Sequence, residues 1–282
     1  MKHIKKCIII VILLIGFSAF SQGPWTQKKG KFYTQISFTT IPNYDTLFGD
    51  PDYSIRGEIS DQTLQFYSEY GLSSKTTLLI NIPYKFISNK GLVNPCLVAP
   101  CPEYSNKKIN LGNIEIGIKH NFYKKDWLVS GQFSVEANTG SFDINSGIRT
   151  GYDAFTFTPL FLAGKSFGKS YLQTFIGTKV RTNKYSSNFK IGGEYGGKIS
   201  KNIWIIGFID IEKSFKNGTI VLPGSNLATG LYVDEQEYGV IGVKAIGKFS
   251  DNLGITASLP AALFGNNVAK QIALSFGIYR KF

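Results

Sequence analysis

Apolar and polar residues alternate with a period of two along most of this chain, most clearly over the last thirteen residues, 270–282. One face of this stretch carries Ile272, Leu274, Phe276 and Ile278, whereas the other carries small or polar side chains. A period of two indicates a β-strand, and this one is longer than the usual strand of about five or six residues. Its length is typical of a tilted strand that crosses a bilayer, and the last strand of a soluble β-sandwich is the alternative.

The same alternation recurs in eleven earlier segments, and no segment has a convincing helical period. Near the middle of one segment, for instance, Ile114, Ile116 and Ile118 alternate with charged or small residues. Bacterial single-chain barrels contain an even number of strands, and the count here is twelve. The predicted strands span about 31–41, 60–70, 76–86, 109–122, 127–138, 153–167, 170–181, 188–199, 203–215, 231–248, 253–264 and 270–282.

The connections between these predicted strands alternate in length. Those after the even-numbered strands contain only a few residues, whereas most of the others are longer. Short periplasmic turns with longer external loops are typical of a transmembrane barrel, and a soluble sandwich has no reason to sort its connections in this way. We therefore predict an all-β fold, a transmembrane antiparallel up-and-down β-barrel with both termini in the periplasm. Its closure requires 270–282 to pair with 31–41 as well as with 253–264.

The N-terminus has the features of a cleaved signal peptide. Three lysines near the start precede a short apolar core at 7–17, and small residues at Ala19 and Ser21 provide a cleavage site. We therefore expect a signal peptide at 1–21, a lead-in at the periplasmic membrane boundary at 22–30, and an outer-membrane barrel at 31–282.

The net charge narrows the range of partners. The formal net charge is +12, and removal of the signal peptide with its three lysines leaves +9. Such an excess could suit nucleic acid, but an exported protein rarely meets any, so we expect no nucleic-acid partner. The excess is consistent with anionic lipid headgroups or with a lumen that favours anions. The expected partners are outer-membrane lipid, a small solute, and the barrel assembly machinery, whose C-terminal signal the final Phe282 resembles.

Two cysteines follow the signal peptide, Cys96 and Cys101, in the sequence NPCLVAPCP. Prolines on both sides and four intervening residues suit a disulfide across a loop tip in an oxidising compartment. His120 is the one histidine beyond the signal peptide, so the sequence offers no zinc-ligand pair, and we predict no metal and no cofactor.

A catalytic site would have to be built around His120. Its position shares the parity of the neighbouring isoleucines, which predicts a lipid-facing ring, whereas Ser130 and Ser134 have the opposite parity. The sequence contains no Gly-x-Ser-x-Gly elbow and no phosphate-binding loop. We therefore predict no enzyme; a lipase-like activity is the alternative, and it would depend on His120.

Charged residues on the polar face of the predicted strands define an expected lumen. On the lipid side, a lysine or arginine near the midplane would cost about 2–4 kcal/mol, so these residues should point inward. They could line a water-filled path, or they could form salt bridges that fill a narrow interior, and a twelve-stranded barrel is compatible with both. The candidates are Glu69, Lys85, Glu115, Lys119, Glu136, Lys179, Arg181, Lys190, Glu194, Lys198, Asp210, Glu212 and Lys244.

Aromatic residues are abundant near the predicted strand ends, where outer-membrane barrels carry aromatic girdles. The expected girdle residues are Tyr33, Tyr70, Tyr84, Trp127, Phe167, Tyr171 and Tyr279.

One hairpin pattern occurs twice, because residues 73–83 resemble residues 250–260. Each copy ends on a proline, Pro83 or Pro260, which removes a ladder hydrogen bond. We expect these prolines to mark bulges or the end of strand pairing.

The segment Tyr67–Tyr84, YSEYGLSSKTTLLINIPY, and the early Trp-containing segment Gly23–Thr26 resemble the outer-membrane barrel transporter family of the meta-pathway of phenol degradation. The motif covers about eighteen residues, whereas the barrel pattern covers the whole mature chain. The resemblance implies a channel or transporter for small molecules, hydrophobic or aromatic compounds among them. The alternative is a structural or adhesive barrel with a plugged lumen that acts through its external loops.

Overall fold

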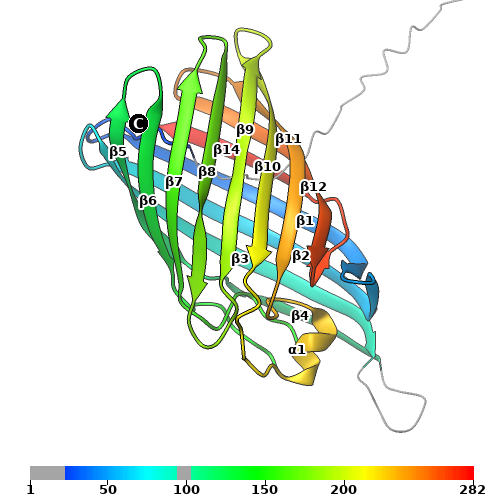
Figure 1. Ribbon diagram of the computed structural model, residues 1–282. Coiled ribbons are helices and arrows are strands. Elements are labelled where there is room, and N and C mark those ends of the chain that lie inside the picture. Colours follow the sequence, from blue (N-terminus) through cyan, green and yellow to red (C-terminus); the bar gives the residue numbers. More distant parts are fainter. Residues whose placement is uncertain (1–22, 94–102) are drawn as a thin grey trace, which may run out of the picture.

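The alternating strands pair edge to edge into a closed antiparallel β-barrel (Figure 1). This computed structural model describes residues 23–93 and 103–282. The predicted signal peptide and the predicted Cys96–Cys101 disulfide therefore lie outside the described residues. The elements are β1 (Phe32–Phe48), β2 (Tyr53–Gly71), β3 (Thr76–Val93), β4 (Glu103–Leu111), β5 (Glu115–Lys124), β6 (Leu128–Glu136), β7 (Thr156–Ser166), β8 (Ser170–Arg181), β9 (Asn188–Lys198), β10 (Ile203–Ser214), α1 (Gly224–Thr229), β11 (Glu237–Lys248), β12 (Leu253–Asn266), β13 (Val268–Ala269) and β14 (Leu274–Lys281).

The last strand closes the barrel against the first. β14 pairs with β1, where Ile278 lies opposite Ile36, and it pairs with β12 on its other side. β4 and β5 both pair with β3 and form one wall strand, and β13 and β14 both pair with β1 and form another. The strand segments therefore make a twelve-stranded barrel. The predicted closed antiparallel barrel, its strand number and its closing pair are confirmed.

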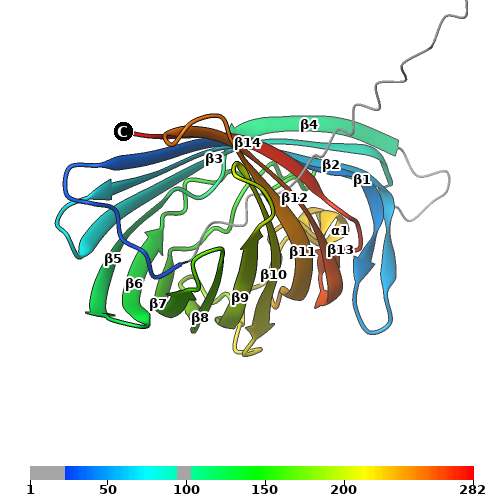
Figure 2. The ribbon, with the colours of Figure 1, turned by 90° about the horizontal axis from the view of Figure 1, so that it is seen from above.

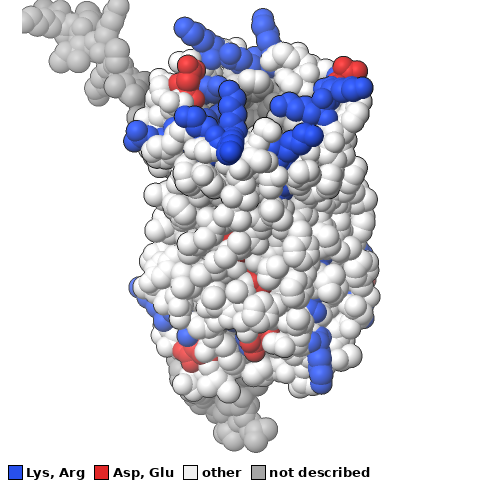
Figure 3. Space-filling view, turned by 90° about the vertical axis from the view of Figure 1, so that its left-hand side faces the viewer, with Lys and Arg blue, Asp and Glu red and all other residues white. Residues whose placement is uncertain are grey.

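Each wall strand turns one face inward and the other outward. On β7, Thr158, Leu160 and Leu162 are buried, whereas Pro159 and Phe161 between them are exposed. The outward face carries large apolar side chains, and Figure 3 shows an almost uncharged band between the two charged ends of the barrel. An apolar surface this continuous is unfavourable in water, and it matches the hydrocarbon layer of a membrane.

The two ends of the barrel differ in their connections. At the end that is uppermost in Figure 1, which we call the turn end, short turns join the strands, and the C-terminus lies there. At the opposite end, which we call the loop end, the connections include the long loops 137–155 and 215–236. No helix among the described residues is long and apolar enough to cross a membrane.

The first strands are longer than predicted. β1 and β2 continue through most of the predicted loop at 42–59, and β3 continues to Val93. The ladder between β1 and β2 accommodates Pro42 at a register shift between Ile41 and Tyr44, so the proline disturbs the pairing without ending either strand. The wall is therefore extended on one side of the loop end (Figure 1).

The predicted strand at 109–122 is divided at 112–114 into β4 and β5. Pro83 of β3 lies opposite the break, and its carbonyl oxygen accepts a hydrogen bond from the Gly112 N–H at 2.8 Å. Proline has no N–H to return, so the ladder is interrupted at this point. Pro260 has the same effect on β12, because the regular pairing of β12 with β14 ends at Ser258, two residues before this proline. Both prolines thus mark breaks in the ladder, as predicted.

Two other predictions of strand extent were wrong. Regular pairing in the terminal strand begins at Leu274 rather than at residue 270, and β11 begins at Glu237 rather than at residue 231. In the second case, Leu231 and Val233 are buried in the loop end, which withdraws this segment from the sheet. The loop before it contains the six-residue helix α1, for which the sequence has no periodic signal because the helix is too short.

Candidate functional site

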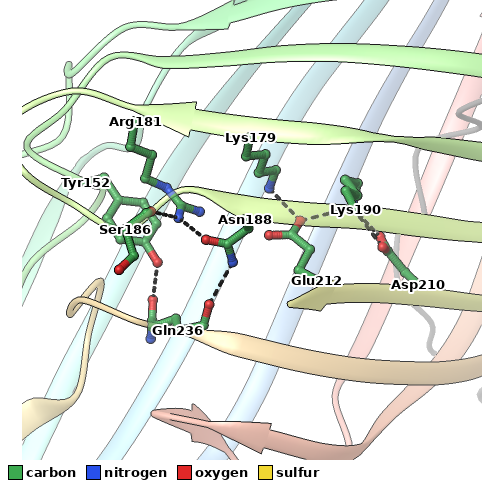
Figure 4. A network of polar contacts seen from close by, with 9 residues as sticks. All are labelled: Tyr152, Lys179, Arg181, Ser186, Asn188, Lys190, Asp210, Glu212 and Gln236. Carbon is green, nitrogen blue, oxygen red and sulfur yellow. Dashed lines mark hydrogen bonds and ion pairs between the residues drawn. The ribbon is translucent and has the colours of Figure 1, made fainter. Parts of the chain in front are cut away.

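The loop-end half of the barrel interior contains a network of buried ion pairs. Glu212 on β10 contacts Lys179 on β8 at 2.6 Å and Lys190 on β9 at 3.0 Å. Lys190 also contacts Asp210 at 2.7 Å (Figure 4). The side chains of Lys190 and Glu212 are 3% and 2% exposed. Because Glu212 and Lys190 each have two partners of opposite charge, either one stays paired when one of its partners is removed.

A second set of polar contacts lies beside the ion pairs, in which Arg181 binds neutral groups. Arg181 donates to the Asn188 side-chain oxygen at 2.7 Å and to the Ser186 carbonyl oxygen at 2.9 Å. Asn188 donates to the Gln236 carbonyl oxygen at 2.8 Å, and the Tyr152 hydroxyl donates to the Gln236 side chain (Figure 4). Burial raises the pKa of Tyr152, so its hydroxyl remains a donor. These bonds connect the loops of the loop end to the inner wall.

Three further ion pairs lie on the inner wall. Each joins a lysine to a carboxylate on another strand, and each of these side chains is at most 13% exposed. Charges paired in this way largely neutralise one another. The pairs are Lys119 with Glu69 at 3.1 Å, Lys244 with Glu194 at 2.7 Å, and Lys85 with Asp61 at 2.8 Å.

The charged residues predicted for the lumen occupy inward-facing positions, and most of them are paired with each other. Arg181 makes only neutral hydrogen bonds. Glu115 and Glu136 lie opposite each other on β5 and β6, and Lys198 is exposed at the turn end. The other predicted residues form ion pairs: Glu69, Lys85, Lys119, Lys179, Lys190, Glu194, Asp210, Glu212 and Lys244.

A hydrophobic cluster occupies the barrel at the loop end. Leu47, Ile59 and Ile87 on the extended strands β1, β2 and β3 pack with Ile148 and Leu231 from two long loops. Each of these five side chains is at most 6% exposed. The loops therefore fold against the barrel wall around an apolar core. We call loops 137–155 and 215–236 together the loop cap.

Polar contacts between its two loops complete the loop cap. Arg149 donates to the Asn226 side-chain oxygen at 3.0 Å, and the Thr229 hydroxyl donates to the Gly147 carbonyl oxygen at 2.9 Å. Gly147 has a φ of +68°, and a Cβ there would lie 1.9 Å from the Ser225 carbonyl oxygen, so glycine is required at this contact. The loop cap is thus a specifically folded unit.

The segment 23–28, expected as a lead-in at the membrane boundary, enters the barrel at the turn end instead (Figure 2). We call it the N-terminal segment. The Ser130 hydroxyl on the inner face of β6 donates to the Pro24 carbonyl oxygen at 2.6 Å. Lys119 on β5 donates to the Gly23 carbonyl oxygen at 3.1 Å. Polar side chains of the inner wall therefore donate hydrogen bonds to backbone oxygens of this segment.

Gln27 makes further hydrogen bonds of this segment, and the Trp25 ring packs edge-on against Tyr171 of the inner wall. The backbone N–H of Gln27 donates to the Thr77 hydroxyl at 2.8 Å, and its side chain donates to Glu69 at 2.6 Å. Glu69 also accepts from Lys119, so the ion pair and the N-terminal segment share one carboxylate. The segment is held mainly by hydrogen bonds to polar side chains.

A cavity of about 410 Å³ lies between the N-terminal segment and the inner wall at the turn end. Sites for small molecules typically have volumes of about 300–1,000 Å³. Lys119, Lys244, Lys248 and Lys281 contribute to its lining. Six aromatic side chains also line it: Trp25, Tyr33, Tyr67, Tyr171, Trp204 and Tyr279.

Three of these aromatics were wrongly expected in a lipid-facing girdle. Tyr33, Tyr171 and Tyr279 point into the cavity. The alternation in the sequence indicates this inward orientation. Tyr279 lies two residues from Lys281 and Tyr171 lies two residues from Gln173, so each tyrosine shares a strand face with a polar residue. Proximity to a strand end is a weaker guide than parity, since a strand end has an inner face as well as an outer one.

Basic residues surround the cavity at the rim of the turn end, and Figure 3 shows them gathered at the top of the molecule. The acidic residues of the turns and adjoining strand ends are Asp126 and Asp251. The basic residues of the rim are Lys28, Lys29, Lys31, Lys75, Lys124, Lys125, Lys165, Lys169, Lys198, Lys201, Lys248, Arg280 and Lys281. The rim therefore attracts anions.

His120 lies on the outward face, where its Nδ1 is 2.9 Å from the Thr76 hydroxyl and its ring packs against Phe122. Ser130 and Ser134 are buried on the inward face, so they cannot serve as its nucleophile. Among the described residues, no group of three or more His, Cys, Asp and Glu side chains could hold a metal ion. The histidine that a lipase-like activity would require therefore lies apart from these serines.

Comparison with known proteins identifies the fold. No protein-family model and no curated protein matches this chain. Its structure is similar to that of an outer membrane channel from Pseudomonas putida F1, with a TM-score of 0.66 and 13% identity over 91% of this chain and 97% of the channel. It is also similar to the translocator domain of the autotransporter NalP from Neisseria meningitidis, with a TM-score of 0.54 and 12% identity over 91% and 90% of the two chains. The chain thus has the fold of an outer-membrane β-barrel.

Proposed function

We propose that this protein is an outer-membrane channel for small molecules, with the turn end and both chain termini in the periplasm. The cavity at the turn end carries the proposal, because it is a solute-sized space inside the barrel, bordered by the basic rim. The apolar outer surface and the predicted signal peptide support the location in the outer membrane. The similarity to an outer membrane channel supports the proposal at the level of the fold.

The resemblance of Tyr67–Tyr84 to a family of barrel transporters for aromatic compounds supports an aromatic or hydrophobic solute. The aromatic lining of the cavity is consistent with this class, because planar rings stack favourably on aromatic side chains. In this interpretation, Tyr67 contributes to the cavity wall from the motif itself.

Passage through the barrel would require movement at both ends. The N-terminal segment lies in the turn end, and the loop cap lies across the loop end. We infer that these two elements are the gates of the channel. The buried ion pairs between them line the route and bind its wall strands together.

Planar-bilayer recording of the purified mature protein tests the proposal, together with liposome uptake of small neutral and anionic aromatic solutes. We expect discrete conductance steps and solute uptake above that of protein-free liposomes. A folded protein that gives neither in wild-type form, nor after the loop cap is weakened by Ile148→Ala, would contradict a channel.

The loop cap favours a second candidate, a structural or adhesive barrel that acts through its external loops. Its buried apolar core closes the loop end and presents an ordered surface. In that case, truncation of the loop 215–236 would abolish cell or ligand adhesion and leave conductance unchanged. An increase of conductance on the same truncation would instead favour the channel.

A further inference from the structure

We propose that the cavity at the turn end binds small aromatic carboxylates, with the carboxylate between Lys248 and Lys281 and the ring between two groups of aromatic side chains. This inference rests on the proposed function and deepens it, because it names the chemical class of the solute. It depends on three features of the cavity: its two ammonium groups without an ion pair, its aromatic walls and its volume.

The four lysines that line the cavity are not equivalent. Lys119 and Lys244 are each paired with a buried glutamate, at 3.1 Å and 2.7 Å. Among the described residues, Lys248 and Lys281 form no ion pair within 4 Å. Their ammonium groups are therefore the ones that can bind an anion.

These two lysines line the same cavity, on the strands β11 and β14 that flank β12. Lys248 of β11 is opposite Gly254 of β12, and Gly254 is opposite Tyr279 of β14, two residues before Lys281 on the same face. Lys248 and Lys281 act electrostatically on each other, and Asp251 of the adjoining turn acts on Lys281 as well. An anion bound between the two ammonium groups would relieve their repulsion.

One aromatic wall is formed by β1, β2 and β14. The Tyr33 ring stacks on the Tyr279 ring at 5.6 Å and meets the Tyr67 ring edge-on at 6.3 Å. The Tyr67 hydroxyl donates to Glu69 at 2.7 Å, and the Tyr33 hydroxyl donates to Gln35. Because these hydroxyls are already bonded, the rings contribute mainly their apolar surfaces to a ligand.

The other aromatic wall is formed by β8, β10 and the N-terminal segment. Tyr171 meets Trp25 edge-on at 5.6 Å and Trp204 at 5.8 Å. The Tyr171 hydroxyl donates to Glu194 at 2.6 Å, which fixes the ring against the wall. A flat ring that enters the cavity would therefore find aromatic partners on both sides.

The combination of features selects among ligand classes. A neutral aromatic molecule would make no use of the two ammonium groups, which lie where the cavity meets the rim. A small inorganic anion would leave the aromatic walls without a partner. An aromatic carboxylate satisfies both, and a cavity of about 410 Å³ is large enough for such a molecule.

Three probes test the proposal on the purified mature protein in detergent, by isothermal titration and by quenching of tryptophan fluorescence. Benzoate has the ring and the carboxylate, benzyl alcohol has the ring without the charge, and acetate has the charge without the ring. We expect benzoate to bind about tenfold or more tightly than either of the others, since charge-assisted hydrogen bonds and stacking both contribute. Equal or weaker binding of benzoate would overturn the proposal.

Paired variants locate the site. Lys248→Gln with Lys281→Gln should weaken benzoate binding about tenfold or more, whereas Lys125→Gln with Lys201→Gln, on exposed turns of the same rim, should leave it unchanged. Trp204→Leu should reduce the quenching by benzoate, whereas Trp127→Leu, outside the cavity, should not. Unchanged benzoate binding in the Lys248 and Lys281 double variant would also overturn the proposal.

Liposome uptake separates this inference from the proposed function. Uptake of neutral solutes without preferential benzoate binding would leave the channel intact and remove the carboxylate site. Benzoate binding without conductance or uptake would support the site and contradict the channel.

Discussion

The two ends of the barrel are closed in physically different ways. At the loop end, side chains such as Ile59, Ile87 and Ile148 form an apolar core that extends from the inner wall into the loop cap. At the turn end, a short N-terminal segment lies against the wall through hydrogen bonds from Ser130 and Lys119. The first closure is a small folded core, whereas the second is a short strap that is held by hydrogen bonds and by the contact of Trp25 with Tyr171.

The difference indicates which end opens more easily. Burial of a large aliphatic side chain contributes about 1.5–3 kcal/mol, and a typical hydrogen bond contributes a net of about 0.5–1.5 kcal/mol. The water that replaces the N-terminal segment can also bond to the polar groups it leaves, which lowers the cost further. We therefore expect the turn end, where the cavity and the basic rim lie, to open more readily in the proposed channel.

The largest expected effect is at the loop cap. Ile148 is fully buried in the apolar cluster, so Ile148→Ala should destabilise the loop cap by about 2–5 kcal/mol. Amide hydrogen exchange should become faster in loops 137–155 and 215–236, and open-channel events should become more frequent. Ile144→Ala is the matched control, because Ile144 lies in the same loop but is 64% exposed. Equal exchange in the two variants would show that the core does not hold the loop cap.

A smaller effect is expected at the turn end. Ser130→Ala removes the donor to the Pro24 carbonyl oxygen and should weaken the hold on the N-terminal segment by about 0.5–1.5 kcal/mol. The rate of solute uptake should rise, while hydrogen exchange in the loop cap stays unchanged. Ser74→Ala, on an exposed turn at the same end, serves as the control. A change in loop-cap exchange in the Ser130 variant would contradict the independence of the two ends.

The smallest effect concerns an exposed ion pair at the loop end, outside the loop cap. The hydrogen bond from Lys270 lowers the pKa of Asp52 in the folded protein. The pair therefore stabilises the fold at pH values above the unfolded pKa of Asp52. This contribution is lost as the pH falls through the lower, folded pKa. Lys270→Gln should raise the Asp52 pKa toward its ordinary value, as followed by NMR titration of the carboxyl group. Loop-cap exchange at neutral pH should not change, and an unchanged Asp52 pKa would contradict the pairing.

Parity in the sequence predicts the wall of the barrel but not what fills it. The alternation around Ile36 and Ile278 is sufficient to predict that the first and last strands pair and close the barrel. It also separates inward charges such as Glu212 and Lys190 from the outward face, although it does not reveal that they pair with each other across strands. That pairing depends on register, which the sequence alone leaves open.

The gates carry no periodic signal. Ile148 and Leu231 lie in loops rich in Gly, Asn and Ser, and their burial depends on the extended strands, which the pattern around Pro42 hides. The N-terminal segment is too short for any period, and its polar partners belong to distant strands. The loop cap and the strap are therefore tertiary features, and only the three-dimensional structure reveals them.

Tethering the N-terminal segment to the barrel wall tests most directly whether this segment gates the turn end. The Gln27 N–H donates to the Thr77 hydroxyl at 2.8 Å, so Gln27→Cys and Thr77→Cys place two cysteines at a direct contact. The double variant is oxidised to a disulfide, which mass spectrometry verifies, in a background with Cys96→Ser and Cys101→Ser. Solute uptake into liposomes is then measured before and after reduction, with the background protein as the control. We expect low uptake with the disulfide intact and a marked rise on reduction, with no response in the control. Equal uptake in the oxidised and reduced states would contradict a gate at the turn end.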